Sequence, residues 1–64
     1  MNIVEAIHDH RFDGPRRKST LQLLVKWEGY PDCDWQQYTG NNLGLVGVVQ
    51  DYLRNHNMRS YIPR

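Results

Sequence analysis

The strongest constraint on the fold is the alternation of apolar and polar residues that leads up to Trp27. Every second residue is apolar, at Leu21, Leu23, Val25 and Trp27. Side chains of a β-strand point alternately to the two faces of its sheet, so these four residues share one face. The pattern predicts a strand over residues 20–27 with that face buried.

Beyond residue 43 the spacing of apolar residues becomes helical. The stripe consists of Leu45, Val48, Val49, Tyr52 and Leu53, which recur at the intervals of one helix face. Asn41 and Asn42 precede the stripe, and Asn side chains accept hydrogen bonds from the free amides of a first helical turn. Gly44 and Gly47 each weaken a helix by about 1 kcal/mol relative to Ala. We therefore expect a helix over residues 43–56 that depends on packing against a sheet.

Two further strands are predicted, at residues 2–12 and 35–38. The first is less regular because Ile3 and Val4 are both apolar and adjacent, which a β-bulge or partial burial of both faces would explain. Residues 13–15, Asp-Gly-Pro, form a strong turn signal. The first and second strands should therefore form an antiparallel hairpin with a long polar tip.

The expected fold class is α+β, with a curled three-stranded antiparallel sheet packed against one C-terminal helix. Residues 1–56 would form the domain, and residues 57–64, which include Pro63, would form a flexible tail. A chain of 64 residues makes one small domain with a thin core. This size argues against an enzyme with a deep cleft that excludes water.

Charge and cysteine content narrow the class of function. The net charge of +1 lacks the strongly basic balance of a dedicated nucleic-acid binder. The single cysteine, Cys33, rules out an internal disulfide, which fits a reducing compartment such as the cytosol or nucleus. The sequence has no apolar run long enough to span a bilayer and no signal-peptide pattern. We expect no membrane association.

Four segments resemble one known family in the right order. They are residues 24–31 (Leu-Val-Lys-Trp-Glu-Gly-Tyr-Pro), residues 4–11 (Val-Glu-Ala-Ile-His-Asp-His-Arg), Trp35, and residues 41–43 (Asn-Asn-Leu). Together they are similar to the signature of chromodomains over residues 2–56. One short match is weak, whereas four in register are specific. The resemblance implies an SH3-like half barrel that binds a peptide, without catalytic residues, metal or cofactor.

The variant Val-Lys-Trp-Glu-Gly-Tyr-Pro at residues 25–31 is similar to the chromodomains at the C-terminus of long-terminal-repeat retrotransposon integrases. That resemblance implies a nuclear protein in which an integrase precedes the domain. The domain would guide DNA integration by binding chromatin.

The family resemblance also implies a ligand, a histone tail whose methylated lysine is held by an aromatic cage. A methylammonium is charged but poorly hydrated, and an aromatic face attracts it by about 0.5–2 kcal/mol. Two of the three cage aromatics of the family match here, at Trp27 and Tyr30, whereas the third position is Asn2. An acid strengthens such cages in the family, and spacing favours Asp34 over Asp32 for this role.

Each of these roles has an alternative. Tyr38 or Tyr61 would replace the missing ring if either reached the cage. The alternative for Trp27 is core packing at a strand end, and for Tyr30 it is a turn aromatic that covers the sheet. Trp35 is expected to pack under the helix.

Family members also pair with the backbone of the target peptide as an added strand. By position, the two flanking segments are Asn2, Ile3, Val4 and Glu5 on one side and residues 40–43, with Asn41 and Asn42, on the other. The alternative for the two asparagines is helix capping. Both roles are compatible because they use different atoms.

The remaining candidates are weaker. The basic run Arg16, Arg17 and Lys18 would contact nucleic-acid phosphates in an alternative in which the domain lacks a cage. A solvated hairpin tip is favoured because the net charge is small. The histidines and Cys33 lack the paired spacing of a zinc site and any catalytic partner. We therefore predict a monomeric, non-enzymatic peptide-binding module.

Overall fold

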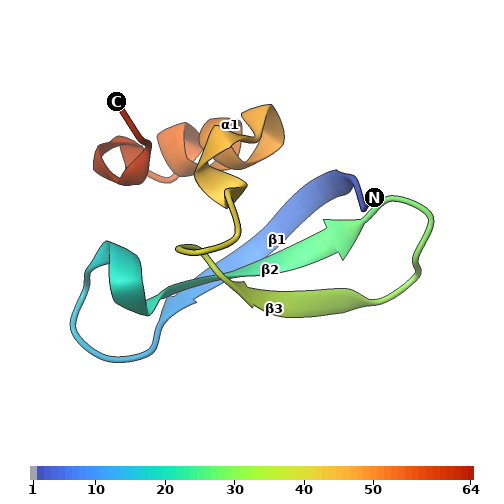
Figure 1. The fold of residues 1–64 in the computed structure, drawn as a ribbon, viewed down its shortest axis with the longest axis horizontal. Helices are drawn as coiled ribbons and strands as arrows, with labels where there is room; N and C mark the ends of the chain where they lie inside the picture. The colour runs from blue at the N-terminus through green and yellow to red at the C-terminus, as the bar shows by residue number, and fades with distance from the viewer. Residues whose placement is uncertain (1) are drawn as a thin grey trace.

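The computed structural model describes residues 2–64, which form one sheet covered on one side by a helix (Figure 1). The strands are β1 (Val4–Phe12), β2 (Leu21–Trp27) and β3 (Cys33–Gln37), and the helix is α1 (Gly47–Asn55). Short 3-10 turns, η1 (Lys18–Thr20), η2 (Leu43–Leu45) and η3 (Arg59–Tyr61), lie between or after them. The predicted α+β fold is confirmed.

The sheet is antiparallel in the order β1-β2-β3, so the strand with the strictest alternation lies at its centre. Val25 pairs with Ile7 on one side and with Asp34 on the other. The pairing of β1 with β2 shifts register twice, between Val4 and Ala6 and again after Ile7. The first shift follows Val4 directly and is a bulge or a similar irregularity, whereas Ile3 precedes the strand and is exposed.

The core lies between the inner face of the sheet and α1. Its buried members are Val4, Leu21, Leu23, Val25, Tyr38, Leu43, Val49, Leu53 and Met58. β2 supplies three of them from alternate positions, and α1 supplies Val49 and Leu53, one turn apart. The sheet thus gives α1, which has only nine residues, the packing surface that so short a helix requires.

The helix begins later than the sequence predicts. Val46 has an extended backbone, with φ −87° and ψ 127°, and it separates η2 from α1. This break turns the residues before it away from the helical stripe, so Leu45 is 70% exposed rather than buried. Val48 is also exposed. The prediction that both belong to the core stripe is wrong.

Asn41 and Asn42 do not cap α1. The residue before the helix is Val46, and no side chain bonds to its first turn. Asn42 instead adopts the left-handed conformation, with φ 56°, and Asn41 donates its Nδ2 hydrogen bond to the carbonyl of Gln37 at 2.7 Å. Both residues therefore form the turn that connects β3 to η2.

The segment after the helix packs against the core, in contrast to the predicted flexible tail. Met58 is 3% exposed, and its amide donates to the carbonyl of Leu53 at 2.7 Å. The hydroxyl of Tyr38 donates to the carbonyl of Tyr61 at 2.5 Å. Apolar packing and backbone bonds thus hold residues 58–61 in place. In residues 2–64 no helix is both long and apolar enough to cross a bilayer.

Trp35 lies on the outer face of the sheet, so the prediction that it packs under the helix is wrong. It pairs with Leu24, while the neighbouring Leu23 and Val25 occupy the helix side. Directly paired residues of adjacent strands share a face. The guanidinium carbon of Arg11 lies 4.1 Å from the centre of the Trp35 ring and covers it.

Candidate functional site

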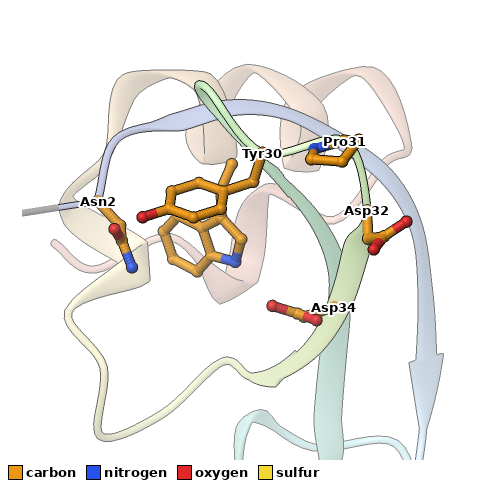
Figure 2. A pocket seen from close by; sticks show the side chains of 6 residues that line it. Asn2, Tyr30, Pro31, Asp32 and Asp34 are labelled. Atoms are coloured by element: carbon orange, nitrogen blue, oxygen red, sulfur yellow. The ribbon is translucent and has the colours of Figure 1, made fainter.

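An open hollow of about 310 Å³ lies at the end of the sheet where β2 ends (Figure 2). Its lining residues are Asn2, Trp27, Tyr30, Pro31, Asp32 and Asp34. Two large aromatic side chains and two carboxylates therefore border one space. We call it the Trp27–Tyr30 hollow.

A tight turn brings the two rings to the same place. Trp27 ends β2 and packs partly against the core, and the amide of Tyr30 donates to its carbonyl at 3.2 Å. Gly29 has φ 85°, a conformation that residues with a Cβ rarely adopt, so glycine permits this reversal. Tyr30 is 56% exposed. The first ring is thus anchored, and the second stands in solvent beside it.

Asn2 lies at the hollow because the residues just before β1 are held beside the end of β2. The amide of Glu28 donates to the carbonyl of Ile3 at 2.8 Å. Figure 2 shows the Tyr30 hydroxyl directed toward Asn2. An amide side chain therefore borders the hollow at the position where the sequence resemblance implies a third ring.

The two aspartates give the hollow negative charge. Asp34 lies on β3, opposite Val25, and Asp32 lies in the loop before it; both are exposed. Lys26, the neighbouring cation, pairs with Glu5 at 3.4 Å. Among residues 2–64, neither aspartate has a basic group within 4 Å. A positively charged ligand would therefore find two available carboxylates here.

The two tyrosines proposed to replace the missing ring do not line the hollow. Tyr38 is 4% exposed, with its hydroxyl bonded inside the fold, and burial raises the pKa of this phenol. Tyr61 packs its ring 5.8 Å from that of Phe12, on another part of the molecule. Two rings, rather than three, border the hollow.

The flanking segments lie at different distances from the hollow along the sheet. In the first segment Asn2 lines the hollow, and the residues after it lead into the edge strand β1, with Ile3 and Glu5 exposed and Val4 buried. Residues 40–43 follow β3 at its other end, beyond Gln37, and are absent from the hollow's lining. The structure thus brings Asn2 of the first segment to the hollow, and no residue of the second segment is among those that line it.

The other predicted candidates lie elsewhere. Arg16, Arg17 and Lys18 are exposed in the loop between β1 and β2. Cys33 is a half-buried free thiol. In the part of the chain that the structure describes, no three His, Cys, Asp or Glu side chains are placed to bind one metal ion. His10 is half-buried, with its Nδ1 2.7 Å from the Tyr52 hydroxyl.

A comparison with models of known protein families identifies the family of this chain. The model of the chromatin organisation modifier (Chromo) domain matches residues 2–39, more than half of the chain. The chain is a chromodomain. No curated protein and no solved structure matches it. Chromodomains are chromatin-associated peptide-binding modules that are typically non-catalytic, and nuclear association with chromatin is consistent with this family.

The chromodomain match runs from Asn2 to the end of β3, so it includes every residue that lines the hollow. The helix α1 lies outside the matched range. Sequence reasoning singled out each lining residue except Pro31. The signal for Pro31 is its place directly after Tyr30, where its fixed φ restricts the turn that carries the ring.

Proposed function

We propose that this chromodomain binds a lysine-methylated histone tail through the Trp27–Tyr30 hollow. The observation that carries the proposal is the position of two aromatic side chains and two unpaired carboxylates around one open space. A methylammonium has a positive charge and an apolar surface, and this lining offers a partner for each property.

The dimensions support entry of a side chain rather than a whole small molecule. A volume of about 310 Å³ is at the lower end of the range for ligand pockets, which is about 300–1,000 Å³. The anchored Trp27 would present a ring face, and Tyr30 would close over the methyl groups from the exposed side. Ordering Tyr30 costs little because an aromatic side chain has only two rotatable angles.

The carboxylates would contribute in two ways. Asp34 projects from a strand and would hold its position close to the bound cation, whereas Asp32 lies in the loop. Both attract a basic peptide from a distance, an effect that salt screens because the groups are exposed. We assign the direct contact to Asp34 and the steering effect to both.

We infer weak binding because one wall of the cage lacks a ring. Asn2 offers an amide in place of an aromatic face, and each lost cation–π contact removes about 0.5–2 kcal/mol. A missing ring thus lowers affinity by roughly 2- to 30-fold relative to a complete cage. The amide would instead hydrogen-bond to the peptide backbone.

The peptide backbone would add to the sheet beside the hollow. β1 is an edge strand, so among residues 2–64 no strand pairs with its outer side, where Val4 and Glu5 begin it. We propose that the tail pairs there and extends toward the turn that contains Asn41 and Asn42. The exposed positions of both asparagines support this path.

We further propose that the domain targets a retrotransposon integrase to chromatin. Support comes from residues 25–31, whose order resembles the integrase-associated variant of the signature. Fusing the domain to the C-terminus of a heterologous integrase and mapping the insertions tests this proposal. Insertions should concentrate at nucleosomes that carry the methylated tail, and an unchanged distribution would contradict the targeting role.

A peptide titration tests the binding proposal directly. Tryptophan fluorescence should change and saturate with a trimethylated histone peptide, because Trp27 lines the hollow. The same peptide without methyl groups should bind more weakly. An equal response to both peptides would favour the second candidate, a chromodomain that binds an unmodified partner, and would remove the methyl-lysine role.

A further inference from the structure

The charged residues of this chromodomain are segregated along its long axis, which measures 32 Å. The end with the hollow carries Glu5, Glu28, Asp32 and Asp34, with Lys26 as its one cation among residues 2–64. The opposite end carries six of the eight basic residues, Arg16, Arg17, Lys18, Arg54, Arg59 and Arg64, against Asp13 and Asp51. We call these residues the basic end.

Two segments that are distant in sequence form the basic end together. The loop between β1 and β2 supplies three of the cations, and α1 and the residues after it supply the other three (Figure 1). The rings of Phe12 and Tyr61 lie 5.8 Å apart and join the two segments. Lys18 and Pro63 line a shared hollow of about 290 Å³. The small net charge of the whole chain therefore conceals a local concentration of positive charge.

Most of these cations have no carboxylate partner. Arg54 pairs with Asp51 at 3.2 Å, and it is the only one of the six with a salt bridge within the described residues. The guanidinium carbon of Arg16 lies 4.8 Å from the centre of the Phe12 ring, which holds it at the junction of the two segments. The other four are exposed and available to an anion.

The C-terminal part of the basic end contains a hollow of about 490 Å³ that three arginines border. Arg54, Arg59 and Arg64 line it together with Ser60. Guanidinium groups bind phosphate oxygens through paired hydrogen bonds, and a serine hydroxyl adds a further donor. The lining is thus suited to phosphate groups, and no Asp or Glu is among its residues.

We propose that the basic end binds the phosphate backbone of DNA while the hollow at the other end holds a protein tail. Five of the six cations are arginines, and the domain measures 23 × 20 Å across its long axis. A face of this width spans about six base pairs of duplex. The association of chromodomains with chromatin places a histone tail and DNA within reach of one small domain.

Binding to the backbone alone predicts little sequence preference and a strong dependence on salt. In a plot of log affinity against log salt concentration, each phosphate contact makes the slope more negative by about 0.9. With four available cations the expected slope is about −3 to −5. Duplexes of equal length but different base sequence should bind with similar affinity.

The experiment measures fluorescence anisotropy of a labelled duplex of about 15 base pairs, from roughly 50 to 200 mM salt. Arg59→Gln should weaken binding at every sequence and reduce the slope by about 1. Lys26→Gln is the matched control, since it removes the same charge from the other end. It should leave both the affinity and the slope nearly unchanged.

Three results would overturn the proposal. They are no binding at the lowest salt, an equal effect of Arg59→Gln and Lys26→Gln, and binding to phosphatidylserine vesicles or polyglutamate that exceeds binding to DNA. Tyr30→Ala separates this proposal from that for the hollow, since it should leave DNA binding intact while weakening peptide binding. Circular dichroism confirms that each variant is folded.

Discussion

The chain contains two Trp-x-x-Tyr pairs of identical spacing, and the fold gives them opposite environments. Trp27 and Tyr30 border an open hollow, with the tyrosine ring in solvent. In the second pair, Trp35 lies under Arg11 on the outer face of the sheet, and Tyr38 is buried with a bonded hydroxyl. The same residues at the same spacing thus border a candidate binding site in one place, whereas in the other the tyrosine joins the core and the tryptophan lies on the outer face of the sheet.

The backbone between the two residues of each pair accounts for the difference. Gly29 turns the chain outward immediately after β2 and leaves Tyr30 in a loop. The second pair has no glycine inside it, so β3 continues to Gln37 and Tyr38 follows in line, with its amide donating to Leu21 at 3.0 Å. A single turn therefore decides whether the tyrosine meets solvent or the core.

The largest expected effect is the loss of stability when the buried tyrosine, Tyr38, is truncated. Tyr38→Ala should lower the free energy of unfolding by about 3–5 kcal/mol because it leaves a cavity and an unpaired carbonyl at Tyr61. Urea denaturation measures this loss. If stability fell by less than about 1 kcal/mol, Tyr38 would not belong to the core.

Truncating the exposed tyrosine should have the reverse effect. Tyr30→Ala should cost less than about 0.5 kcal/mol of stability but weaken binding of the methylated peptide by roughly 10-fold, because it removes a cation–π contact. Tyr30→Phe, the matched control, should retain most of the affinity. Equal losses in the two variants would point to the hydroxyl rather than the ring.

Adding a third ring to the hollow should make the first pair a stronger binding site for the methylated peptide. Asn2→Tyr places an aromatic face at the third wall and should raise affinity for the methylated peptide by about 1 kcal/mol, or roughly 5-fold. Calorimetric titration of both proteins checks this. A matching gain for the unmodified peptide would show that the added ring makes nonspecific contacts instead.

The smallest effect concerns the hydroxyl of the buried tyrosine. Tyr38→Phe should cost about 0.5–1.5 kcal/mol by removing its hydrogen bond to Tyr61. Burial raises the pKa of Tyr38 above its ordinary value of 10.0, so the folded state retains the proton more strongly than the unfolded state does. Stability from this group is therefore complete below pH 10 and declines as the pH rises further.

Unfolding curves of the two proteins at pH 9 and pH 11 measure this dependence. The alkaline loss of stability should be smaller in Tyr38→Phe. Tyr52 also contributes, since burial and then the negative charge of Asp9 raise its pKa. An identical decline in both proteins would assign the effect to Tyr52 alone.

Local patterns predicted most of the sheet but less of the helix. Alternation identified β2 to within one residue, and the family signature identified Trp27, Tyr30 and Asp34, which the fold brings together. The helical stripe placed Val49 and Leu53 correctly and Leu45 wrongly. Periodicity assumes a continuous helix, and the extended backbone at Val46 interrupts it without any proline to signal the break.

The sequence by itself determined the strands, the fold class and the two rings next to the turn, because alternation and glycine act on neighbouring residues. The tertiary structure alone decided that Tyr38 is buried, that Met58 joins the core and that two basic segments meet at one end. These outcomes depend on contacts between residues distant in the chain. No local pattern records which segment will cover a given face, since that choice follows from packing the whole domain.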